Sequence, residues 1–169
     1  IPGPQVMTKN PELFWGMIAS MWIGNLMQHY GFSPVQAGLT VTLFLFSVVI
    51  ASTATAPIFD RIPHRAVVAA GFLVGAAAFL AVSRLPIEAS SLNAIIALHV
   101  IAGLGTGTAL SVTHGNIGRT DNPHRLFGTV NVALGVLGVF FFAALPQLVS
   151  HFGAATMFMV FAATMAIAS

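Results

Sequence analysis

This sequence contains no cysteine, so it has no disulfide framework, no thiolate nucleophile and no thiolate metal site. Charged side chains are also scarce, at 6% of the residues, whereas a soluble domain is about one quarter charged. So few charges cannot cover a surface that faces water, which makes an unusually apolar soluble protein the weaker alternative. With 57% of its 169 residues hydrophobic, the chain is typical of a protein that crosses a membrane several times.

The small number of charges also limits the classes of partner. Six Lys and Arg residues against four Asp and Glu residues are too small and too scattered an excess to indicate nucleic-acid binding. The first residues, IPGPQVMTKN, lack the basic, apolar and small-residue order of a signal peptide. They also lack an initiating Met, so we expect the natural chain to begin earlier.

Six apolar stretches approach the length of about 20 residues that a helix needs to cross the hydrocarbon core of a bilayer. We therefore predict an all-α fold, in which residues 1–169 form one six-helix transmembrane bundle. The predicted spans are 11–29, 34–59, 66–83, 92–117, 126–150 and 154–169. The last stretch gives only about 24 Å of helix and is still apolar at Ser169, so we expect a longer chain.

The basic residues gather on one side of this bundle. With the N-terminus in the cytoplasm, five of the six lie in cytoplasmic segments, as the positive-inside rule predicts. We therefore expect an integral membrane protein with a cytoplasmic N-terminus, located in the bacterial inner (plasma) membrane. The cytoplasmic residues are Lys9, Arg61, Arg65, Arg119 and Arg125, and the outer one is Arg84.

One cytoplasmic loop, APIFDRIPHR at residues 56–65, concentrates ionisable residues in an otherwise apolar chain. It resembles the loop signature of the major facilitator superfamily, in which a Gly, an Asp-Arg pair, a second Gly and a basic cluster follow the second span. Ala56 and Pro63 stand in place of the two glycines, and a His replaces one basic residue. The positions that match are Asp60, Arg61 and Arg65.

Other stretches resemble the same family in the same order. YGFSPVQAGL at residues 30–39 resembles the link into the second span. HVIAGLGTGTAL at residues 99–110 resembles the glycine-rich fourth span, with His99 where Arg is usual. GVLGVFFFAALPQL and HFGAATMFMVFA resemble the fifth span and the entry into the sixth. The resemblance covers nearly the whole chain and corresponds to the N-terminal six-helix half of a twelve-helix transporter.

The resemblance implies a secondary active transporter that moves a small molecule by alternating access, with the substrate near the midplane between this half and a second one. The expected partners are the lipid bilayer, a second six-helix half or another membrane subunit, and the small-molecule substrate. No nucleotide site is visible, so we expect coupling to a proton or ion gradient and no cofactor. The substituted motif leaves one alternative open, a non-transporting structural subunit or assembly factor of a larger membrane complex.

The resemblance gives Asp60, Arg61 and Arg65 the role of a latch between the two halves. The alternative is a local salt bridge that closes a turn. Asp60 ends a span, where the helix dipole disfavours an anion. We therefore expect Arg61, Arg65 or the N-terminus of another helix to lie beside its carboxylate.

Polar residues inside the spans are the candidates for a proton or substrate site. The ordinary imidazole pKa of about 6.5 suits His99 to carry a proton, and the alternative is a neutral ring bonded to a backbone carbonyl of the first span. Thr106 and Thr113 lie close to one face of the fourth span, where we expect a cavity or a bond between helices. The other candidates are Asn25 in the first span and Asn131 in the fifth.

Two GxxxG runs, GFLVG at residues 71–75 and GLGTG at residues 103–107, predict close helix packing. The sequence holds no HExxH motif, no pair of intramembrane carboxylates and no convincing Ser/His/Asp set. We therefore predict neither an enzyme nor a metal site.

Overall fold

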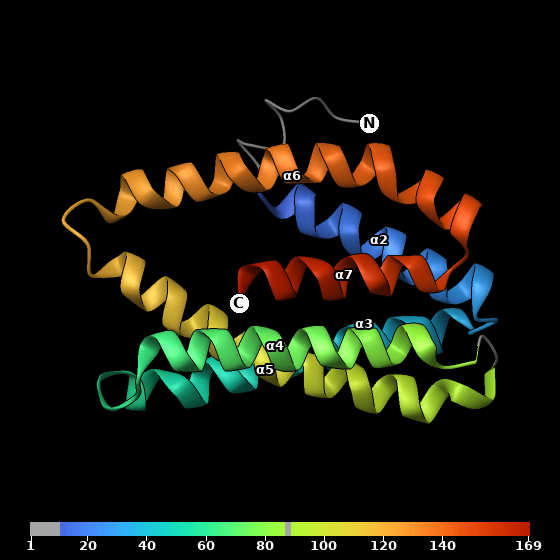
Figure 1. The fold of residues 1–169 in the computed structure, drawn as a ribbon, viewed down its shortest axis with the longest axis horizontal. Helices are drawn as coiled ribbons and strands as arrows, with labels where there is room; N and C mark the ends of the chain where they lie inside the picture. Colours follow the sequence, from blue (N-terminus) through green and yellow to red (C-terminus); the bar gives the residue numbers. More distant parts are fainter. Residues whose placement is uncertain (1–10, 87–88) are drawn as a thin grey trace.

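The computed structural model describes residues 11–86 and 89–169, and within these ranges every regular element is a helix. Six α-helices run roughly along one axis (Figure 1). Between them lie two short 3-10 helices. The first, η1 (Ala56–Arg61), directly follows α3 (Pro34–Thr55), and the second, η2 (Ala89–Ser91), directly precedes α5 (Leu92–Gly118). The predicted all-α fold is confirmed, and each predicted span coincides with a helix to within a few residues. The helices are α2 (Pro11–His29), α3 (Pro34–Thr55), α4 (His64–Arg84), α5 (Leu92–Gly118), α6 (Pro123–Phe152) and α7 (Ala155–Ala168).

Four of these helices are long and apolar enough to cross a membrane: α3 together with η1, α4, α5 and α6. The helix α2 has 19 residues and α7 has 14, and neither is among the four. Fourteen residues give about 21 Å of helix, less than the hydrocarbon core requires. The structure therefore supports four of the six predicted spans by length and composition. Lys9, which contributes to the predicted orientation, lies outside the described residues.

Local sequence signals set the helix ends at the two links that join α2 to α3 and α5 to α6. Ser33 Oγ accepts a hydrogen bond from the Gln36 backbone N–H, and the Gln36 side chain accepts one from the Ser33 backbone N–H. This capping box, followed by a proline at the first helical position, fixes the start of α3. In the same way, Asn122 Oδ1 accepts from the Arg125 backbone N–H at the start of α6.

Glycines bring α5 into close contact with its two neighbours. A Cβ atom added at Gly103 or Gly107 would collide with the backbone of α3, and one added at Gly71 of α4 would collide with the Gly105 carbonyl of α5. Only residues without a side chain allow backbones to approach this closely. The close packing predicted from the two GxxxG runs is confirmed, and it joins α3, α4 and α5 into one tight unit.

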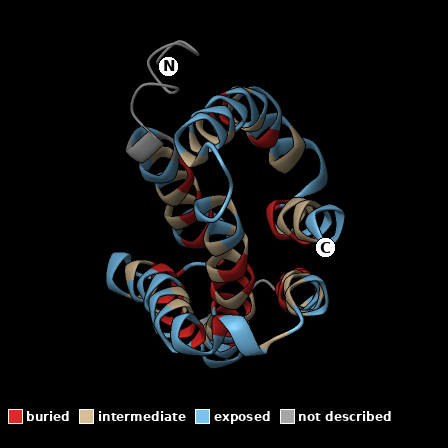
Figure 2. Ribbon diagram, turned by 90° about the vertical axis from the view of Figure 1, so that its left-hand side faces the viewer, coloured by how far each residue is buried: buried red, intermediate tan, exposed pale blue. Residues whose placement is uncertain are grey.

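The aromatic core lies where α2, α4, α5 and α7 meet. Trp22, Phe79 and Phe158 are buried there, and buried residues face the interior of the bundle in Figure 2. The helix α6 passes over α2 and α7 (Figure 1) and buries only Gly135, Gly138 and Leu145. One side of the bundle is thus tightly packed, while the side formed by α2 and α6 is more open.

Candidate functional site

His99, a predicted proton or substrate residue, is fully buried in α5 with 0% of its surface exposed. Trp22 Nε1 of α2 donates a hydrogen bond to His99 Nε2 over 3.1 Å. An indole N–H can only donate, so Nε2 carries no proton and Nδ1–H donates to the Ile95 carbonyl over 2.7 Å. The imidazole in this arrangement is neutral, and both of its nitrogens are engaged.

Aromatic rings enclose the His99 imidazole. The centroids of the Trp22, Phe79 and Phe158 rings lie 5.2, 5.5 and 5.6 Å from its own. These contacts favour the structural alternative to a proton carrier. One detail of that alternative is wrong, because the carbonyl bonded to His99 belongs to its own helix, and the first span contributes the Trp22 side chain.

The other predicted polar residues do not join His99 in a single site. Thr106 lies two turns further along α5 and faces α7, with its hydroxyl 3.7 Å from Met165 Sδ. Thr113 Oγ1 donates to the Ala109 carbonyl of its own helix over 2.8 Å. Asn131 is half-buried on α6. His99 and Thr106 therefore belong to the packed interior, where side chains of neighbouring helices occupy the space around them.

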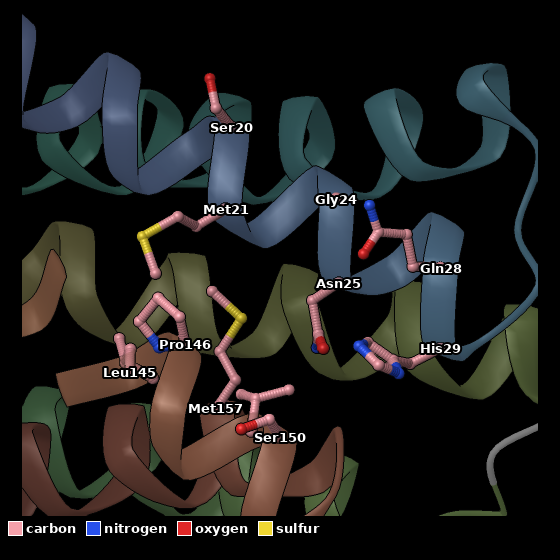
Figure 3. Close-up of a pocket in the computed structure, with 11 residues that line it drawn as sticks. Ser20, Met21, Gly24, Asn25, Gln28, His29, Leu145, Pro146, Ser150 and Met157 are labelled. Atoms are coloured by element: carbon pink, nitrogen blue, oxygen red, sulfur yellow. The ribbon is translucent and has the colours of Figure 1, made fainter. Parts of the chain in front are cut away.

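Asn25 lies elsewhere, in the wall of a cavity of about 450 Å³ between α2, α6 and α7 (Figure 3). The cavity is at the end of the bundle that carries the α2–α3 and α6–α7 links, opposite the loop of Asp60. Figure 3 shows the Asn25 and His29 side chains extending from α2 toward Met157 and Ser150. The lining residues are Ser20, Met21, Gly24, Asn25, Gln28 and His29 of α2, Leu145, Pro146, Val149 and Ser150 of α6, and Met157 of α7.

The Asn25 amide is only partly satisfied. Its side chain is 6% exposed, and Nδ2 donates to the Ala154 carbonyl over a long 3.4 Å. Oδ1 has no hydrogen-bond partner among the described residues. A buried acceptor without a partner destabilises a fold by about 1–3 kcal/mol. Asn25 is thus a buried group that a ligand N–H or O–H would stabilise.

Tyr30, in the link between α2 and α3, is a second incompletely satisfied residue. Its ring is 1% exposed and packs against Phe158 at a centroid distance of 5.8 Å. Its hydroxyl finds no partner in the described part of the chain, and burial raises the pKa of the phenol to about 12. The hydroxyl therefore stays protonated and available as a donor at physiological pH.

A second cavity of about 300 Å³ continues along α2 and shares Ser20 and Met21 with the first. We call the two together the α2–α6 groove; on α2 its lining extends from Leu13 to His29, which corresponds to about 24 Å of helix. A Cβ atom added at Gly16 or Gly24 would have no neighbour within 4 Å. Across the described ranges, no group of three or more His, Cys, Asp or Glu side chains could hold a metal ion.

At the opposite end of the bundle, the cation beside Asp60 is Arg119, which follows α5. Arg119 Nη1 lies 2.6 Å from Asp60 Oδ1, and this hydrogen bond raises the pKa of the guanidinium. The expectation that Arg61 or Arg65 would compensate Asp60 is therefore corrected. Both of these residues are exposed, and the ion pair joins two loops of the same six-helix unit.

Phe59 anchors this ion pair. Its ring is 7% exposed, and a Cβ atom added at Gly115 of α5 would collide with it. The Arg119 guanidinium carbon lies 4.4 Å from the centroid of the same ring. We call Phe59, Asp60, Gly115 and Arg119 the loop clasp. The α5 side of the clasp was not predicted, because its only signal in the sequence is that Gly115 and Arg119 stand one turn apart.

Comparison with known proteins adds an independent result. The family model described as Major Facilitator Superfamily matches residues 12–169. Two Agrobacterium vitis proteins are similar over 26 residues, or 15% of this chain. One, "Uncharacterized protein in TAR-II ttuC' 3'region", is 73% identical over 11% of its length, and the other, "Uncharacterized 52.8 kDa protein in TAR-I ttuC' 3'region", is 69% identical over 5% of its length. No solved structure matches.

Proposed function

Because the chain belongs to the Major Facilitator Superfamily, a family of transporters of integral membrane type, we propose that it forms one half of a secondary active transporter that moves a small molecule by alternating access. The observation that carries this proposal is the cavity of about 450 Å³ with Asn25 in its wall. A buried polar group with an unmet hydrogen bond, beside an apolar cavity, is the usual chemistry of a small-molecule site.

The uneven packing of the helices supports movement of one part of the bundle against another. Glycines bring α3, α4 and α5 into close contact, whereas the α2–α6 groove separates α2 from α6 at residues 142–150. Alternating access requires elements that move as rigid bodies past a bound substrate. We propose that the α3–α4–α5 unit is the rigid body and that the α2–α6 side faces a second six-helix half.

We propose separate tasks for the charged residues of the loop at 56–65. Asp60 is engaged by Arg119 within this unit, while Arg61 and Arg65 are exposed at the same end. We propose that the clasp holds the loop in shape and that Arg61 and Arg65 contact the second half, forming the latch between the halves. We place this end, with the N-terminus, on the cytoplasmic side of the bacterial inner membrane.

A proton or ion gradient is the proposed energy source. The packing of His99 gives it a positioning role, because its hydrogen bonds attach α2 to α5. We therefore do not route the coupling proton through His99.

Gradient-driven uptake tests the proposal. The full-length protein is reconstituted in proteoliposomes with an imposed proton or sodium gradient, and solutes accumulated from a mixture of small molecules are identified by mass spectrometry. We expect at least one solute to accumulate only with the gradient. No gradient-dependent accumulation, together with stable copurification in a larger membrane complex, would instead support the non-transporting subunit.

The Asp60→Asn variant tests whether transport depends on the shape that the loop clasp gives to the loop at 56–65. Loss of the ion pair to Arg119 frees the loop, and we expect slower uptake with unchanged folding, because the pair is exposed. Asp121→Asn, which removes an exposed carboxylate from the α5–α6 loop, is the matched control and should transport normally. Equal uptake rates in the two variants would show that transport does not need the Asp60–Arg119 ion pair, and would contradict the proposed role of the clasp.

A further inference from the structure

The α2–α6 groove is elongated, and no helix within the described residues fills it. Its two cavities meet at Ser20 and Met21 and follow α2 from Leu13 to His29. Elsewhere in the bundle, an added Cβ at Gly71, Gly103 or Gly107 would meet the backbone of a neighbouring helix, whereas one at Gly24 would have nothing within 4 Å. The groove thus offers room for an extended ligand along one face of α2.

The polarity of the groove changes along its length. At the end near the α2–α3 link, its wall carries Asn25, Gln28 and His29 of α2. Further along, apolar side chains dominate, among them Leu13, Met17, Met21, Phe142 and Leu145. A ligand that matches this wall has a polar group at one end and an apolar chain at the other.

The polar end of the wall also restricts the head group. Asn25 Oδ1 is a buried acceptor without a partner in the described chain, so it favours a ligand that donates an N–H or O–H. Among the described residues that line the two cavities, none is Asp, Glu, Lys or Arg, and His29 is the one ionisable side chain. A cationic head would lose its hydration in this wall without gaining an anionic partner among the described residues, and an anionic head would meet only the His29 imidazole.

We propose that the α2–α6 groove binds a single-chain amphiphile whose uncharged head donates a hydrogen bond to Asn25 and whose alkyl chain lies along α2 past Gly24 and Met21. The assignment of this amphiphile as the transported substrate rests on the proposed function, whereas its binding in the groove does not. The substrate class is therefore a neutral alkyl amide or alcohol.

Equilibrium binding of radiolabelled dodecanamide to the full-length protein in lipid nanodiscs tests this proposal. We expect unlabelled dodecanamide to compete at least tenfold better than dodecanoate, dodecyltrimethylammonium or acetamide, which lack the neutral head or the chain. Competition by acetamide as strong as that of dodecanamide would overturn the role of the groove in binding the chain. Equal competition by the two charged amphiphiles would overturn the assignment of an uncharged head.

Two pairs of variants localise the site. Asn25→Leu should weaken dodecanamide binding about tenfold, the equivalent of one hydrogen bond of about 1.4 kcal/mol. Asn116→Leu, the same change at an exposed position of α5 outside the groove, should leave it unaltered. Gly24→Leu fills the groove and should abolish binding, whereas Gly38→Leu, at an equally open glycine on α3, should not. Wild-type affinity in both Asn25→Leu and Gly24→Leu would overturn the proposal.

Photo-crosslinking of the unsubstituted protein provides a test that does not depend on the folding of variants. Dodecanamide with a diazirine on its chain should label peptides of residues 13–29 and 142–150, and labelling confined to α3 or α4 would refute the site. The outcome is separable from that of uptake. If dodecanamide crosslinks in the groove but no solute is transported with a gradient, only the proposed function is wrong. If transport is unchanged in Gly24→Leu, only the assignment of the amphiphile as the substrate is wrong.

Discussion

The contact between Trp22 and His99 predicts a measurable coupling between α2 and α5. Trp22→Phe removes the indole N–H and leaves His99 Nε2 as a fully buried acceptor without its partner, which should lower the free energy of unfolding by about 1–3 kcal/mol. His99→Leu removes the acceptor and leaves the indole N–H unpaired, with a similar loss. The double variant carries neither unpaired group, so the two losses should not add.

A double-mutant cycle gives the magnitude. Hydrogen bonds between membrane helices contribute about 0.6 kcal/mol on average and at most about 1.7 kcal/mol, so we expect a coupling energy in that range. Unfolding of the detergent-solubilised protein by dodecyl sulfate, followed by far-ultraviolet circular dichroism, provides the four free energies. His114→Leu is the matched control, because His114 makes the same bond to a carbonyl four residues earlier in α5. If the coupling energy between Trp22→Phe and His99→Leu is no larger than that between Trp22→Phe and His114→Leu, the Trp22–His99 contact is refuted.

Two further predictions concern packing and orientation. Gly107→Ala places a methyl group against the Val48 backbone and should destabilise the protein by about 1–3 kcal/mol. Gly38→Ala, which meets no neighbour, should destabilise it by no more than a few tenths, and equal losses in the two variants would contradict the close α3–α5 packing. In intact cells, a membrane-impermeant maleimide should label Arg84→Cys but not Arg65→Cys, and the reverse pattern would contradict the predicted orientation.

The positions of the helices were predictable because their signals are local. Apolar length sets the spans, and a capping box with a following proline starts α3 at the predicted residue. That another helix would pack closely against each GxxxG run was also predictable, because such a run in a membrane helix usually marks a helix contact. Which helix fills each run could not be derived, since Gly71 meets Gly105 across 34 positions of chain with no sequence signal for the pair.

The candidate site was less predictable than the fold, because a polar residue in a span has the same signature whether it faces a cavity or a partner. His99 and Asn25 are both buried polar residues, yet only Asn25 lines the groove. The difference arises from Trp22, whose N–H satisfies His99 from another helix. Likewise, Arg119, the partner of Asp60, is 59 residues away in the sequence. Arg61 and Arg65 are much closer in the sequence, so they were predicted as the partners instead.

Accessibility of Ser20→Cys tests the central claim, that the α2–α6 groove is the alternately exposed path of a transporter. Residues 1–169 contain no cysteine, and Ser20 lines both cavities. We predict that an impermeant maleimide reacts with Ser20→Cys at a rate that changes with the imposed gradient and falls when dodecanamide is added, while Val35→Cys, on the exposed start of α3, reacts at a constant rate. If the rate at Ser20→Cys, like the rate at Val35→Cys, changes neither with the gradient nor with dodecanamide, that claim is contradicted.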